Sequence, residues 1–266
     1  MARLVTDTSR LSALMGGAPR GPAAHTLFRD GRVFFVGGVL PVYETLETMF
    51  DSFCTEATSL FYLTFGPRET FSQGEEMARQ IKKNFNVRLM ARLDGGTEAG
   101  LLERVYAAGV DNIDLQLGEV TDGRGWAAAV PPSLRAGVAV FPRWGVAATL
   151  PLGTAPPAAA MAGIDALLGE GVVPLVKFAS PAVGYSPGDV AAVLDHLVTG
   201  WERNAVPLGI FLPLISVMTP LVSAKPAGHF QELLDRFRDR RQLAESDIRR
   251  HLRVRQAEDS LDSAGL

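Results

Sequence analysis

Short apolar runs alternate with amphipathic stretches along most of this chain, at a spacing of about 25 to 30 residues. The runs that we expect to form strands are 32–40, 59–65, 86–93, 111–117, 146–152, 172–178 and 208–215. The stretches that we expect to form helices are 41–53, 71–85, 98–108, 134–140, 156–170 and 189–203. Such an alternation is typical of β/α units on a parallel sheet. The sequence therefore predicts an α/β fold, a partial or full parallel TIM-type barrel with six to seven β/α units.

The composition fits one domain built around a single core. The 266 residues are 47% hydrophobic and 21% charged, as in packed globular proteins. We expect a lead-in segment at 1–31, the barrel at 32–222 and a helical extension at 223–266. Arginines and acids are interleaved in the extension, which indicates a solvated helix face. Such a face suits docking onto a partner or onto a second copy of the chain.

Charge and residue counts exclude several classes of function. A formal net charge of −3 gives no global attraction to nucleic acid. The single cysteine, Cys54, excludes an internal disulfide and favours a reducing, cytoplasmic location. Its position on the apolar side of the helix expected at 41–53, near the end of that helix, predicts a packed core thiol. The histidines lack the spacing of metal ligands, so no metal site is expected.

Residues 205–224 carry no charged side chain over a length that is close to that of a membrane-spanning helix. Pro207, Pro213 and Pro220 interrupt this segment, and an interior proline breaks the hydrogen-bond ladder of a helix. We therefore expect a buried strand at 208–215 followed by a loop, and no membrane span. A membrane-associated scaffold is the least favoured of the functional hypotheses.

Polar side chains occupy alternate positions in several of the expected strands, and alternate residues of a strand share a face. The pairs that share a face are Tyr62 with Thr64, Arg92 with Asp94, and Asp114 with Gln116. Lys177 is a further polar position, on the sixth expected strand at 172–178. Active sites of parallel barrels lie at the carboxyl ends of the strands. Buried charges require partners, so these residues form either a structural ion-pair network or a cavity for a polar ligand.

Four segments, in this order, resemble the radical S-adenosylmethionine superfamily, in its biotin-synthase-like branch. They are 60–70 (LFYLTFGPRET), 107–117 (AAGVDNIDLQL), 138–153 and 163–174. The resemblance implies a β/α barrel that binds S-adenosylmethionine, with Gly66 and Glu69 at the turn that holds the amino group of the cofactor. Thr64, Arg92 and Gln116 are the further polar residues that we expect to contact a bound ligand or cofactor.

The chain departs from that family where an iron–sulfur cluster would bind. The family places a Cys-x3-Cys-x2-Cys loop after the first strand, because three thiolates hold the cluster. Here residues 37–43 read GGVLPVY and contain no thiol, so no cluster is expected. The chain then resembles a degenerate member, which binds a small polar ligand such as S-adenosylmethionine or serves as partner subunit of a cluster-bearing enzyme.

A second hypothesis is a Schiff-base lyase, and the sequence leaves open whether the chain is an enzyme. Residues 176–181 (VKFASP) resemble the strand of class I aldolases that carries the imine-forming lysine. That resemblance implies Lys177 as nucleophile, with Asp94 or Asp114 as general acid and base. A neighbouring cation, Arg92, would favour the free amine.

Overall fold

The computed structural model describes residues 4–16, 22–117, 131–153, 155–178, 184–223, 247, 248 and 250. Its centre is a seven-stranded sheet in the order β2-β3-β4-β5-β6-β7-β8. The strands are β2 (Leu27–Asp30), β3 (Val33–Gly37), β4 (Leu60–Thr64), β5 (Arg88–Asp94), β6 (Asn112–Gln116), β7 (Val146–Leu152) and β8 (Val173–Phe178). β2 pairs antiparallel with β3, and every later pair is parallel. The predicted α/β fold with a parallel sheet is confirmed.

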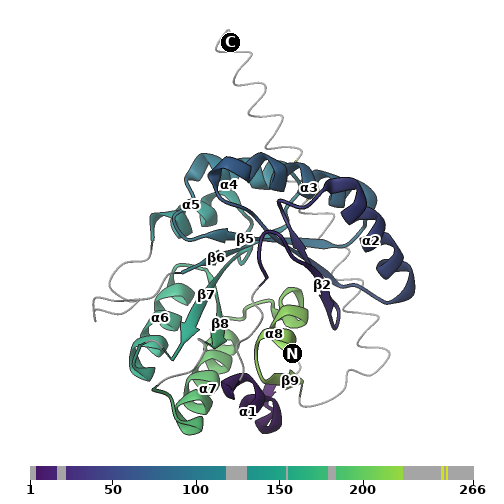
Figure 1. Ribbon diagram of the computed structural model, residues 1–266. Helices are drawn as coiled ribbons and strands as arrows, with labels where there is room; N and C mark the ends of the chain where they lie inside the picture. The colour runs from purple at the N-terminus through teal and green to yellow at the C-terminus, as the bar shows by residue number, and fades with distance from the viewer. Residues whose placement is uncertain are drawn as a thin grey trace.

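Helices alternate with these strands as the apolar spacing predicts. They are α2 (Val42–Thr55), α3 (Phe71–Asn84), α4 (Ala99–Ala107), α5 (Pro132–Val140), α6 (Pro157–Gly169) and α7 (Pro187–Arg203). They lie around the outside of the sheet, which curls into part of a barrel (Figure 1). Both faces of the parallel strands are buried, which explains why β3, β4 and β7 are almost continuously apolar.

A helix, not a strand, occupies the gap between the two edges of the sheet. The strand expected at 208–215 is wrong, because the chain forms a 3-10 turn, η3 (Leu208–Ile210), and then α8 (Leu212–Met218). α8 contacts both β8 and β3 and lies in the open side of the curled sheet (Figure 1). Leu208, Phe211 and Ile215 are buried at helical spacing, and Pro213 stands in the first turn, where a missing N–H costs nothing. The described strands form an open barrel.

The beginning of the chain joins the fold near α8. β1 (Leu4–Thr6) pairs antiparallel with β9 (Leu221–Ser223), and α1 (Thr8–Gly16) follows β1. β2, which falls inside the expected lead-in segment, adds an edge strand to the sheet. The division into a lead-in, a barrel and an extension stays a prediction. Most of the expected extension at 223–266 lies outside the described residues.

Two features of the structure bear on the expected core thiol and on the uncharged segment at 205–224. Cys54 is exposed on α2, so the expected packed core thiol is wrong: its side chain lies on the outer face of the helix. No helix in the described ranges has the length and apolar character needed to cross a membrane.

Candidate functional site

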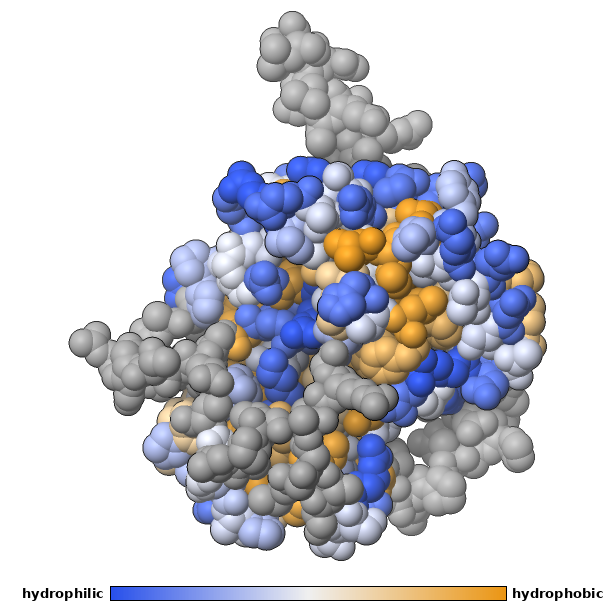
Figure 2. Space-filling model, viewed as in Figure 1, coloured by the Kyte–Doolittle hydropathy of each residue, from blue (hydrophilic) through white to orange (hydrophobic). Residues whose placement is uncertain are grey.

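Polar side chains from five neighbouring strands meet inside the curl of the sheet. We call Tyr62, Arg92, Asp114, Gln116, Thr149 and Lys177 the polar cluster. The register of the parallel strands places Thr64 beside Arg92, and Arg92 beside Asp114. Gln116 pairs in register with Thr149 of β7. Because register partners share a sheet face, these side chains lie together. In the same view as Figure 1, hydrophilic surface gathers close to β5 and β6 (Figure 2).

Asp114 is the centre of the cluster and is fully buried. The Tyr62 hydroxyl donates to its Oδ2 atom at 2.5 Å, and the Gln116 amide donates to the same atom at 2.8 Å. Thr149 Oγ1 lies 2.8 and 2.9 Å from the two carboxylate oxygens. Three donors therefore surround this carboxylate, which serves as the acceptor that holds the interior side chains in place.

Gln116 connects the buried carboxylate to Lys177. Its amide nitrogen donates to Asp114, which turns its carbonyl oxygen toward the lysine. The Lys177 ammonium donates to Gln116 Oε1 at 3.1 Å. Lys177 is partly buried near the carboxyl end of β8. Its position therefore depends on a chain of hydrogen bonds that reaches back to Tyr62 and Thr149.

Burial and charge act against each other at Asp114. Burial raises the pKa of this carboxyl, while hydrogen bonds from Tyr62 and Thr149 and the charges of Arg92 and Lys177 oppose the rise. Burial also raises the pKa of Tyr62 well above 10.0, helped by the negative charge of Asp114. The phenol therefore stays protonated and keeps donating. The charges of Arg92 and Lys177 both act on the one carboxylate.

The structure brings together most of the predicted site residues. Thr64, Arg92, Asp114, Gln116 and Lys177 all come from the inner face of the sheet. Asp94 lies beside Gln116 in register but is exposed at the end of β5.

The two positions taken from the resemblance lie elsewhere. Gly66 follows β4, and the exposed Glu69 lies in the 3-10 turn η1 (Arg68–Thr70). Arg68 of that turn pairs with Glu98, on the exposed surface. No contact among the described residues links Glu69 to the polar cluster, and its expected role in cofactor binding stays a prediction.

Sequence reasoning placed Tyr62 on the shared face but missed its role, and it missed Thr149 altogether. Tyr62 of β4 reaches across β5 to Asp114 of β6, a contact that only a strongly curled sheet permits. Thr149 carries a usable signal, because it is a polar residue at an alternate position of an otherwise apolar strand. A hydroxyl at such a position, opposite Gln116, indicates a partner inside the barrel.

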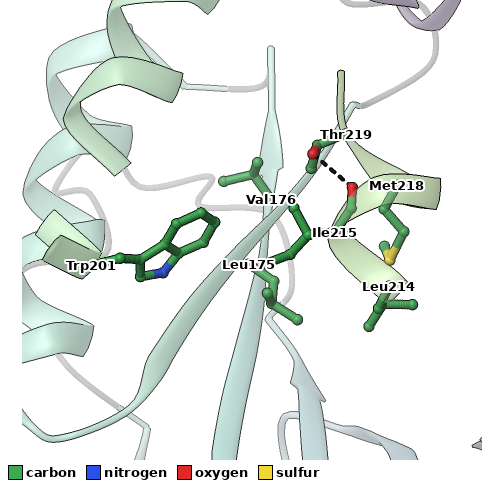
Figure 3. Close-up of a pocket in the computed structure, with 7 residues that line it drawn as sticks. All are labelled: Leu175, Val176, Trp201, Leu214, Ile215, Met218 and Thr219. Atoms are coloured by element: carbon green, nitrogen blue, oxygen red, sulfur yellow. Dashed lines mark hydrogen bonds between the residues drawn. The ribbon is translucent and has the colours of Figure 1, made fainter. Parts of the chain in front are cut away.

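An apolar seam lies beside the polar cluster, between β8, α7 and α8. Leu175, Trp201, Leu214 and Met218 line it, and the space between them is too narrow for a water molecule (Figure 3). Thr219 at its edge donates to the carbonyl of Ile215, in its own helix (Figure 3). The side chains of the seam pack α8 into the opening of the barrel, and the seam offers no polar group to a ligand.

The described residues contain no group of three His, Cys, Asp or Glu side chains that could hold a metal ion. An iron–sulfur cluster does not fit this chain either. Three thiolates are needed to hold such a cluster, and the one cysteine is the exposed Cys54 on α2.

Comparison with known proteins does not assign a family. No protein-family model matches the chain, and no curated protein matches it. Among solved structures, the chain is similar to one in the Amycolatopsis orientalis BexX/CysO complex. The identity is 14% and the TM-score 0.40, and the match covers 62% of this chain and 63% of that chain, less than two thirds of its length. A likeness at that level carries no argument about function.

Proposed function

We propose that the chain binds a small anionic ligand at the carboxyl end of the curled sheet, with Lys177 and Arg92 as its cationic contacts. The observation that carries the proposal is the meeting of two cations on the inner face of the sheet. Arg92 and Lys177 lie on inward positions, and among the described residues both charges act on the buried carboxylate of Asp114. The exposed Asp94 at the rim is screened by water and offsets little of this charge.

The hydrogen bonds of Asp114 support the same proposal. Tyr62, Gln116 and Thr149 surround the carboxylate, so its nearest donors are neutral groups. Arg92 acts on Asp114 through its charge, while one of its guanidinium nitrogens donates to the carbonyl of Pro22. The cluster therefore presents positive charge toward the carboxyl end of the sheet, while its negative charge lies deeper inside the curl. Carboxylate and phosphate groups are the ligand chemistry that such a site recognises.

S-adenosylmethionine, the cofactor expected from the resemblance, is a cation overall, but its methionine part carries a carboxylate, which makes it one candidate ligand. Its carboxylate could contact Arg92 or Lys177 without any iron–sulfur cluster. A role as partner subunit of a cluster-bearing enzyme is a separate prediction, which copurification with such an enzyme would test.

Calorimetric titration tests the proposal with inorganic phosphate, pyruvate and S-adenosylmethionine as probes. At least one of them should bind the wild-type chain, and Lys177→Met should weaken that binding about tenfold or more, the scale of one charge-assisted hydrogen bond. Lys83→Met is the matched control, because Lys83 is exposed at the end of α3 and should not affect the affinity. Equal affinities of the two variants would contradict the proposal.

A second candidate function is imine chemistry at Lys177. It is favoured by the position of Lys177, a partly buried lysine near the carboxyl end of β8, because parallel barrels carry their active sites at that end of the strands. Borohydride reduction with pyruvate would then add a stable mass to Lys177, located by peptide mass spectrometry. Reversible pyruvate binding without that adduct would leave anion binding as the function and exclude the imine.

A further inference from the structure

A short turn, residues 22–26, lies across the carboxyl ends of three neighbouring strands, and we call it the strap. The carbonyl of Ala24 accepts from the amide of Val39 at 3.0 Å, just beyond β3. The carbonyl of Pro22 accepts from Arg92 on β5. Since β4 lies between β3 and β5 in the sheet, the strap passes over the end of β4.

The strap approaches β3 so closely that only glycine fits beneath it. A Cβ atom on Gly37 would lie 2.2 Å from the carbonyl oxygen of Ala24, well inside contact distance. Within the strap, the amide of Thr26 donates to the carbonyl of Ala23 at 3.1 Å, and Thr26 Oγ1 accepts from the amide of Ala23 at 3.0 Å. The strap is therefore a formed turn whose position on the sheet is fixed by these contacts.

Thr64 lies at the end of β4, under the strap. Its hydroxyl is buried and has no hydrogen-bond partner in the part of the chain that the structure describes. The whole residue is 7% exposed, and its register partner on β5 is Arg92. A buried hydroxyl without a partner destabilises the folded state, because it has lost its hydrogen bonds to water. Within the described ranges, Thr64 is thus an unused donor beside a guanidinium group, at a cost to stability.

We propose that Thr64 and Arg92 form an oxyanion subsite for a carboxylate or phosphate group, and that the Pro22 carbonyl occupies this subsite in the ligand-free protein. The inference rests on the proposed function and deepens it. Both residues offer donors, and the planar guanidinium matches the oxygens of a carboxylate or a phosphate. A charged oxygen is a stronger acceptor than a neutral carbonyl, so a bound oxyanion should displace Pro22 and release the strap.

The ligand-free protein provides the first test, through Thr64→Val. Valine has nearly the shape of threonine without its hydroxyl, so this change removes an unpartnered group. The melting temperature should stay the same or rise. Thr149→Val is the matched comparison and should lower it, because Thr149 donates to Asp114. A clear loss of stability in Thr64→Val would show that the hydroxyl has a structural partner. That result would overturn the subsite and leave the proposed function standing.

Binding provides the second test, with inorganic phosphate and pyruvate as the two probes. Thr64→Val should weaken the binding of the preferred anion about tenfold or more, and the stronger binder shows whether the subsite favours phosphate or carboxylate. Saturation with that anion should speed hydrogen exchange at the amides of the strap and of Val39. Wild-type affinity in Thr64→Val with unchanged exchange, while Lys177→Met loses binding, would overturn the subsite and leave the proposed function standing. Failure of both anions and of S-adenosylmethionine to bind the wild-type chain would contradict the proposed function itself.

Discussion

Replacement of Tyr62 by phenylalanine removes one hydrogen bond from the buried carboxylate of Asp114 and leaves the ring in place. The phenol donates to Asp114 Oδ2 at 2.5 Å, and Tyr62 is fully buried. A hydrogen bond to a charged group is worth about 1.5–3 kcal/mol. We therefore expect a loss of about 2 kcal/mol in the free energy of unfolding, which lowers Tm by about 4–8 °C in a chain of this size. Urea denaturation at pH 7 measures the loss directly.

The pH dependence of this loss tests its physical cause. Burial raises the pKa of Asp114 above its ordinary 3.8, so the folded state binds the proton more tightly than the unfolded state. The contribution of Asp114 to stability is therefore greatest at acid pH and falls as the pH rises from 3.8 through the folded pKa. The Tyr62 phenol donates more strongly to the ionised carboxylate. The effect of Tyr62→Phe should thus be largest above the folded pKa and should shrink on acidification.

The control for this prediction is Tyr43→Phe, because Tyr43 is 79% exposed on α2. That change should alter the free energy of unfolding by less than about 0.5 kcal/mol. The reasoning is refuted if Tyr62→Phe is no more destabilising than Tyr43→Phe, or if its effect does not vary with pH.

Two further predictions concern the packing around the barrel. Asp111→Ala should cost about 3–5 kcal/mol, because it leaves Lys82 and the amide of Leu89 without their buried carboxylate and leaves Arg250 paired with Asp247 alone. Arg250→Ala should cost less, since Asp111 keeps Lys82 and the amide of Leu89. Equal losses in urea denaturation would contradict this order. Both glycines lie in α7, where alanine is the better helix former, but Gly200→Ala should give a lower Tm than Gly188→Ala, since its Cβ would lie 2.7 Å from Leu168 Cδ1 and that of Gly188 no nearer than 3.6 Å to another atom. Thermal melts of the two variants check the contrast.

The six central strands could be predicted because parallel strands buried on both faces are continuous apolar runs. β7 has the predicted bounds of 146–152, and β4 and β8 differ from the prediction by a residue or so at each end. Alternation along the strands also predicts that Thr64 shares a face with Tyr62, Arg92 with Asp94, and Asp114 with Gln116. Local pattern is enough for these features because each depends only on the period of one strand.

Other features depend on contacts that no single segment encodes. The run at 208–215 is apolar in either state, and its packing against β8 and β3 selects a helix, with Pro213 in the first turn. β2 carries a hairpin signal in Asp30-Gly31, since Gly31 has a φ of +54°, but the run before it is too short to identify alone. The bond between Tyr62 and Asp114 depends on how strongly the sheet curls.

Chemical footprinting of lysines tests the central claim most directly, because it reports on Lys177 itself. The chain is acetylated briefly with and without an excess of phosphate or pyruvate, and the modified peptides are measured by mass spectrometry. We predict that the anion which binds protects Lys177 and leaves the modification of Lys83 unchanged. The opposite result is equal modification of Lys177 with and without each anion, at anion concentrations far above physiological ones. That result would contradict a ligand site at the carboxyl ends of these strands.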